Sequence, residues 1–131
     1  MIVTVQVYQL SYTALQVTPE LFKEIIATYQ RHGWELKRVL IKPSTHACLK
    51  EQTAELFKEA KLIEAEFDAL WFARSSHAGR EAWELRLVAE QPYALFEAFE
   101  TDETEAEREE ARLEMENKMR AQVGQSCGVR L

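Results

Sequence analysis

Five polar residues with anion-binding chemistry lie in one short segment near the middle of the chain: Arg74, Ser75, Ser76, His77 and Arg80. Guanidinium, hydroxyl and imidazole groups bind phosphates and carboxylates through charge-assisted hydrogen bonds. The same composition is typical of a solvated turn whose arginines pair with nearby acids, and no glycine-rich phosphate motif accompanies it. The segment is therefore a candidate anion or ligand site, with a plain hairpin turn as the alternative.

Two further groups of residues have the chemistry of metal ligands but not the spacing. Glu64, Glu66 and Asp68 alternate as on one face of a strand, where successive carboxylates stand about 6.5 to 7 Å apart and do not easily share one ion. His46 and Cys48 lack the paired spacing of zinc ligands, and a nucleophilic Cys48 would need a base close in space. We expect no metal site, no cofactor and no catalytic residue.

Three tryptophans, Trp34, Trp71 and Trp83, form a candidate aromatic pocket. Such rings can wall a site for a flat ligand. They also fall at the spacing of core-facing residues, and rings at this spacing more often fill the core between a sheet and a helix. Both interpretations stay open at the level of sequence.

Two runs of alternating apolar residues must position these side chains, and they predict a β-hairpin with its turn at residues 75–80. Leu70 and Phe72 point away from Trp71, so the sheet has apolar groups on both faces. A face that no helix covers needs a partner. The residues predicted on the tryptophan face are Phe67, Ala69, Trp71 and Ala73 in the first run and Trp83, Leu85, Leu87 and Ala89 in the second.

The N-terminal part of the chain predicts a strand, a helix and a second strand. Alternating valines indicate a strand from Val3 to about Leu10, and residues 34–42 indicate another that ends before Pro43. Between them, Thr18 is a predicted N-cap and Gly33 a predicted stop. The apolar face of this helix comprises Leu21, Phe22, Ile25, Ile26 and Tyr29.

Weaker patterns follow this unit. Residues 44–62 predict one helix, and residues 63–72 predict a strand that continues into the hairpin. Tyr93–Phe99 is compatible with a helix that begins at Pro92, or with a strand that places Leu87 opposite Phe96. We favour the strand, because Asp102 and Glu105 have the spacing of a capping box and suggest a new helix start.

The C-terminal segment predicts a strongly acidic helix over residues 102–123, followed by a disordered tail over residues 124–131. Its apolar stripe is narrow and contains Ala111, Met115 and Met119. A helix with so few apolar residues gains little from packing, so it projects into solvent, packs on a second subunit or frays.

The overall charge of -6 is concentrated in this segment. Between Glu100 and Glu116, nine acidic residues against two arginines give a net charge of -7 and leave +1 for the rest. This distribution argues against nucleic-acid binding and against an anionic membrane surface. No stretch approaches the ~20 apolar residues of a membrane span, and no secretory signal is recognisable, so we expect a reduced, cytoplasmic protein.

Together these patterns predict an α+β fold in one domain, residues 1–123. We expect a single-layer, mainly antiparallel sheet of four or five strands with helices packed on one face, as in a ferredoxin-like or related two-layer sandwich. The predicted function is that of a homo-oligomerising interaction or accessory module, with a protein partner and without catalysis. The alternative is a small-molecule or anion-binding protein, or an enzyme, that uses the aromatic pocket with Arg74, His77 and Arg80.

Overall fold

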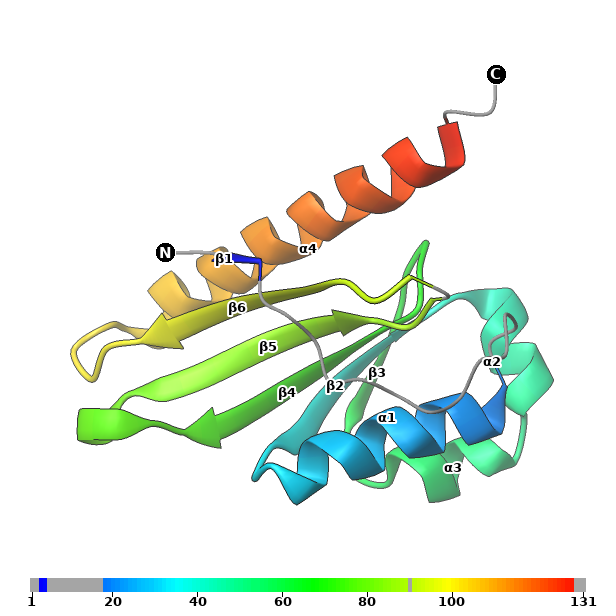
Figure 1. Ribbon diagram of the computed structural model, residues 1–131, viewed down its shortest axis with the longest axis horizontal. Helices are drawn as coiled ribbons and strands as arrows, with labels where there is room; N and C mark the ends of the chain where they lie inside the picture. Colours follow the sequence, from blue (N-terminus) through cyan, green and yellow to red (C-terminus); the bar gives the residue numbers. More distant parts are fainter. Residues whose placement is uncertain (1–2, 5–17, 90, 129–131) are drawn as a thin grey trace.

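The computed structural model describes residues 3–4, 18–89 and 91–128 (Figure 1). The strands in these ranges form one sheet in the order β1-β6-β5-β4-β2-β3, in which β2 and β3 are parallel and the other described neighbours are antiparallel. The strands are β1 (Val3–Thr4), β2 (Glu35–Ile41), β3 (Lys61–Glu64), β4 (Ala69–Ser75), β5 (Glu81–Leu87) and β6 (Ala94–Phe99). The helices are α1 (Pro19–Arg31), α2 (Pro43–Leu49), α3 (Gln52–Phe57) and α4 (Glu105–Gly128), with a short 3-10 turn η1 (His77–Gly79).

The α+β class, the mainly antiparallel sheet and the C-terminal helix are confirmed, but helices cover both faces of the sheet. Helices α1, α2 and α3 pack on one face, and α4 crosses the other (Figure 1). The expectation that helices pack on only one face is therefore wrong. Trp71 and Phe72 point to opposite faces of the sheet and both are buried, so each face must be covered. The chain covers the second face with its own C-terminal helix.

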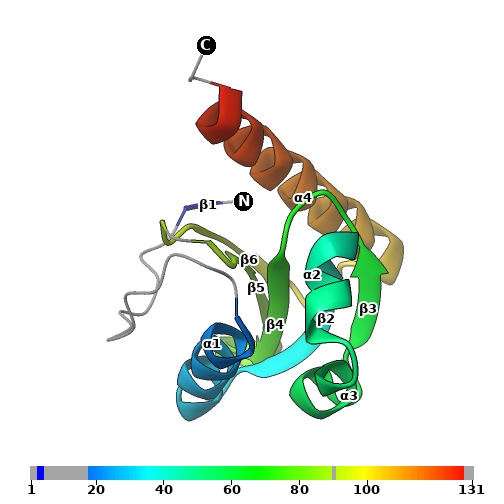
Figure 2. The same ribbon diagram turned by 90° about the vertical axis from the view of Figure 1, so that its right-hand side faces the viewer.

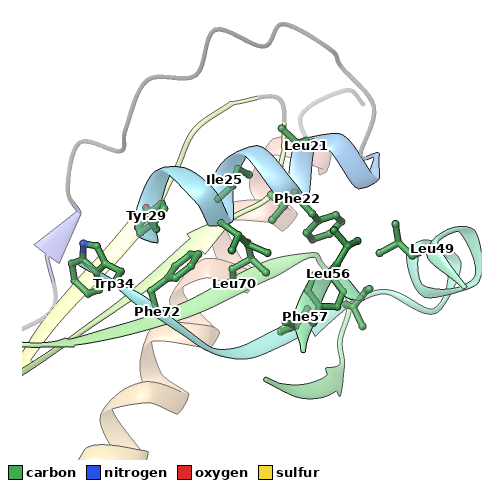
Figure 3. Packing of buried hydrophobic residues seen from close by; sticks show 14 of the residues in the cluster. Leu21, Phe22, Ile25, Tyr29, Trp34, Leu49, Leu56, Phe57, Leu70 and Phe72 are labelled. Carbon is green, nitrogen blue, oxygen red and sulfur yellow. The ribbon is translucent and has the colours of Figure 1, made fainter. Parts of the chain in front are cut away.

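Helix α1 follows its sequence signals closely. The Thr18 hydroxyl accepts a hydrogen bond from the Leu21 amide at 3.2 Å, Pro19 occupies the first turn, and Gly33 follows the helix with a φ of 88°. The predicted apolar face is buried against the sheet and α3, where Phe22 meets Phe57 edge to face at 5.3 Å (Figure 3). Local sequence therefore specifies both the limits of α1 and the side that packs.

The β4–β5 hairpin is also confirmed, with Ala69, Trp71 and Ala73 paired with Leu87, Leu85 and Trp83 respectively. These residues form the core beneath α4, together with Leu95, Phe99, Met115 and Met119. The stripe of α4 therefore packs on the same chain, and Met115 and Met119 are fully buried. They do not provide a surface for a second subunit.

The segment between β2 and β4 differs from the prediction in two ways. Residues 43–57 form two short helices instead of one, because Lys50 has a φ of 48° and interrupts the helical path. The predicted strand over residues 63–72 is split into β3 and β4 by residues 65–68. Asp68 causes much of this break, because its buried carboxylate accepts hydrogen bonds from the Lys42 amide at 2.9 Å and the Thr45 hydroxyl at 2.8 Å.

Residues 94–99 form a strand, as favoured, but with a different register. Leu85 lies opposite Leu95 and Glu84 opposite Phe96, so the predicted pairing of Leu87 with Phe96 is wrong. The connection after Leu87 is longer than the tight turn on which that pairing depended, since the Leu87 amide bonds to the carbonyl oxygen of Tyr93. The change reverses the face on which each β6 side chain lies.

Helix α4 begins at Glu105, later than predicted, and continues to Gly128, beyond the predicted boundary at residue 123. The capping box consists of Thr104 and Glu107 instead of Asp102 and Glu105, with reciprocal side-chain to amide bonds of 3.1 and 2.9 Å. For the opening strand, Val3 and Thr4 pair with β6. The rest of that predicted strand lies outside the described residues.

Candidate functional site

The structure directs the two arginines of the predicted anion site toward different partners. Arg74 donates to the His32 carbonyl oxygen at 2.6 Å and lies 4.7 Å from the Trp34 ring centroid. Arg80 donates through Nε to both carboxylate oxygens of Glu100, at 3.0 and 2.9 Å. The intervening Ser75, Ser76 and His77 are exposed at the tip of the hairpin. Anion binding by these five residues stays a prediction.

The three tryptophans of the predicted aromatic pocket lie on two faces of the sheet. Trp34 packs beneath α1, whereas Trp71 and Trp83 pack beneath α4 with ring centroids 5.8 Å apart. All three side chains are buried. The sheet separates Trp34 from the other two rings, so the three do not wall a common pocket.

A buried polar cluster that sequence reasoning missed lies between α1 and the sheet. The Tyr29 hydroxyl donates to Glu84 Oε2 at 2.5 Å, and Arg86 is only 2% exposed. Arg86 donates through Nε to the Leu87 carbonyl oxygen, while its buried Nη1 has no hydrogen-bond partner within the described residues. A signal was present in the alternation of Glu84 and Arg86 with Trp83, Leu85 and Leu87, but that pattern also describes a strand with one face in water.

Burial raises the pKa of the Glu84 carboxyl, although the Tyr29 hydrogen bond and the charges of Arg86 and Arg74 oppose this. The pKa of Tyr29 is also raised, mainly by burial and then by the charge of Glu84. The cluster therefore favours a neutral tyrosine as donor and resists full ionisation of the carboxyl.

We predict that Glu84→Gln changes how stability depends on pH. A carboxyl whose pKa is higher in the folded state retains its proton as pH rises above the unfolded-state value of ~4.3, so its contribution to stability is lost as pH rises through the folded-state pKa. As pH rises from acidic to neutral, the urea concentration at the unfolding midpoint should therefore decrease for the wild type relative to the glutamine variant. A difference that stays constant, or grows in the wild type's favour, would contradict the buried ionisable carboxyl.

A second polar cluster attaches α4 to the sheet. Arg112 is 2% exposed, lies 4.0 Å from the Trp83 ring centroid, and donates to Glu105 and Glu109 at 2.8 Å each. Arg38 from β2 donates two further bonds to Glu109, at 2.8 and 3.2 Å. The hydrogen bond from Arg38 is the main cause that lowers the pKa of Glu109, while that from Arg112 lowers the pKa of Glu105. Part of the acidic character of α4 thus serves attachment within the chain.

The free edge of β3 provides the best candidate for binding. In the described part of the chain, β3 is the last strand of the sheet and pairs with β2 alone. The Ala65 amide donates to the Ile41 carbonyl oxygen at 3.0 Å, and in a parallel ladder alternate residues direct their backbone groups toward the same neighbour. Ile63 therefore faces β2, whereas Leu62 and Glu64 direct their N–H and C=O groups away from the sheet.

A groove of about 630 Å³ beside this edge is lined by residues of β3, α2 and the end of β2. Figure 2 shows the positions of β3, α2 and β2 in the fold. Leu62, 36% exposed, is one of two large hydrophobic side chains exposed in the described residues. The groove combines an apolar floor with basic residues from α2 and its C-terminal end. Its lining comprises Ile41, Pro43, His46, Ala47, Lys50, Leu62, Ile63 and Glu64.

No protein-family model, curated protein or solved structure matches the chain. None of the described helices has both the length and the apolar composition needed to cross a membrane. Backbone donors and acceptors that have no partner strand among the described residues, and that lie beside an apolar groove, suit the addition of an extended segment as a further strand.

Proposed function

We propose that the protein is an interaction module that binds an extended polypeptide segment along the free edge of β3. The observation that carries this proposal is the position of Leu62 and Glu64, whose backbone groups face away from the sheet beside the groove that α2 borders. Backbone hydrogen bonds provide affinity in strand addition, and side-chain pockets provide specificity. The sheet would extend by one strand without any change to its core.

The features of β3 support this function in two ways. Strand β3 contains no proline, so the amides of Leu62 and Glu64 that face away from the sheet can donate to an added strand. Its charged residues, Lys61 and Glu64, stand only at its two ends. The exposed Leu62 between them contributes to the groove, where an alternate side chain of an added strand would lie.

The proposal predicts that Leu62→Pro abolishes peptide binding while the fold remains intact. The Leu62 amide points outward, so proline removes a donor from the free edge without removing a hydrogen bond to β2. Peptides selected from a random display library should show apolar residues at alternate positions. They should bind the proline variant about tenfold more weakly or worse, which corresponds to ~1.4 kcal/mol.

Leu113→Lys is the matched control, because Leu113 is the other exposed large hydrophobic residue in the described ranges and lies on α4. Peptide binding is measured by fluorescence anisotropy, and retention of the fold by circular dichroism. Equal loss in the two variants, or selected peptides that bind the proline variant as well as the wild type, would refute binding at the β3 edge.

A further inference from the structure

Basic and acidic residues occupy different positions around the β3 groove. Lys50 follows α2, and Lys61 begins β3, whereas Glu64 ends β3 and Glu66 follows it. Lys50, Lys61 and Glu64 are exposed, while Glu66 pairs with Arg120 of α4 at 3.1 Å. An added strand fits best if it has an acid where Lys50 lies.

Strand β3 itself supplies such an acid, Glu64, when a second copy runs antiparallel to it. In an antiparallel ladder, residues that direct their backbone groups to the shared edge must lie opposite one another. Leu62 then pairs with Glu64 of the second copy, and Glu64 with Leu62 of the second copy. Ile63 lies opposite Ile63 of the second copy, at the two-fold axis, and each Leu62–Glu64 pair exchanges both of its N–H to O=C hydrogen bonds.

This register brings opposite charges near one another. Glu64 of the second copy lies opposite Leu62, within the groove that Lys50 also lines. Lys61 lies opposite Ala65 of the second copy, on the face of the sheet away from Glu64, so the complementary charge contact of this register is that between Lys50 and Glu64. A parallel arrangement would instead place Lys61 beside Lys61 and Glu64 beside Glu64, which is unfavourable for like charges on neighbouring strands.

We infer that the segment bound at the β3 edge is β3 of a second copy of this chain, paired antiparallel about Ile63. This inference rests on the proposed function and names its partner. The result is a closed, two-fold symmetric dimer with one continuous sheet, in which the same surface patch is used by both copies. Such closure also removes two exposed edges that would otherwise allow uncontrolled association.

Cysteine cross-linking tests the register directly. With Cys48 and Cys127 replaced by serine, Ile63→Cys should form a disulfide-linked dimer on mild oxidation, because directly opposite Cβ atoms in a pair without backbone hydrogen bonds approach the ~3.8 Å of a disulfide. Leu62→Cys is the matched control. Residue 62 is exposed on the same strand. Residue 62 of the second copy is only a diagonal neighbour, about 7 to 8 Å away, so Leu62→Cys should form no disulfide under the same oxidation.

A charge exchange tests the partner. Glu64→Lys places a second cation against Lys50 of the second copy, and Lys50→Glu places a second acid against Glu64 of the second copy. Each variant alone should therefore dimerise about tenfold more weakly, as measured by sedimentation velocity. An equimolar mixture of the two variants should recover dimerisation as a heterodimer that contains one complementary contact of each kind. A mixture no stronger than its components would overturn the antiparallel pairing.

The two proposals fail differently. If Ile63→Cys does not cross-link and the wild type sediments as a monomer, while selected peptides still bind in a Leu62-dependent manner, self-pairing is wrong and binding at the edge stands. If neither cross-linking nor Leu62-dependent peptide binding occurs, both are wrong. Cross-linking at Leu62 but not at Ile63 would overturn the register.

Discussion

Arg86→Met is expected to lower the free energy of unfolding at neutral pH by about 1 to 3 kcal/mol, because it removes the hydrogen bond to the Leu87 carbonyl oxygen and the charge that most opposes the raised pKa of Glu84. Methionine preserves most of the buried volume of the arginine, so the loss reports charge and not a cavity. Urea unfolding at neutral pH, followed by circular dichroism, measures it.

The double variant Glu84→Leu with Arg86→Met identifies the cause. Removing both groups should restore part of the stability lost in the single variant, because no buried carboxyl then remains to ionise without the charge of Arg86. Arg74→Met is a control for burial, because the charge of Arg74 also favours ionised Glu84 but its side chain is exposed, and it should cost less than about 1 kcal/mol. Additive losses in the double variant would contradict the coupling of Glu84 and Arg86.

Arg112→Ala is expected to lower the free energy of unfolding by about 3 kcal/mol and to loosen α4 from the sheet. The loss combines the cation–π contact with Trp83, about 2 kcal/mol when desolvated, with the packing of the buried side-chain stem. Its ion partners Glu105 and Glu109 retain access to water, so their contribution is smaller. Tryptophan fluorescence should shift to longer wavelength as Trp83 becomes accessible.

Arg120→Ala provides the control within the same helix. Arg120 also has an acidic partner, Glu66, and lies 5.7 Å from the Phe67 ring centroid, but its side chain is 42% exposed. Its loss should stay below about 1 kcal/mol with no change in tryptophan emission. Equal effects of the two arginines would show that burial of Arg112 does not determine how firmly α4 is held.

Local sequence determined the elements whose signals lie within a few residues of one another. Thr18, Pro19 and Gly33 are sufficient to set the limits of α1, because capping and the left-handed turn are local interactions. Alternation around Trp71 and Trp83 likewise determined the faces of the β4–β5 hairpin. The acidic C-terminal helix followed from composition alone.

What each face packs against depends on contacts between residues that are far apart in the sequence. The stripe that contains Met115 and Met119 could equally have met a second subunit, and only the position of α4 across β4, β5 and β6 buries it within the chain. Glu84 and Arg86 alternate like residues of a solvated strand face, yet α1 encloses them with Tyr29. Periodicity specifies which side chains share a face but not what covers that face.

The β3 edge shows the same division. Sequence placed Ile63 in one long strand, because alternation continues through Phe67 without a local stop signal. The break depends on Asp68, whose carboxylate binds the start of α2, far away in the sequence. Local patterns thus determined which residues are strand or helix, while long-range hydrogen bonds and the order of the strands decided that β3 ends early and stands at the free edge of the sheet.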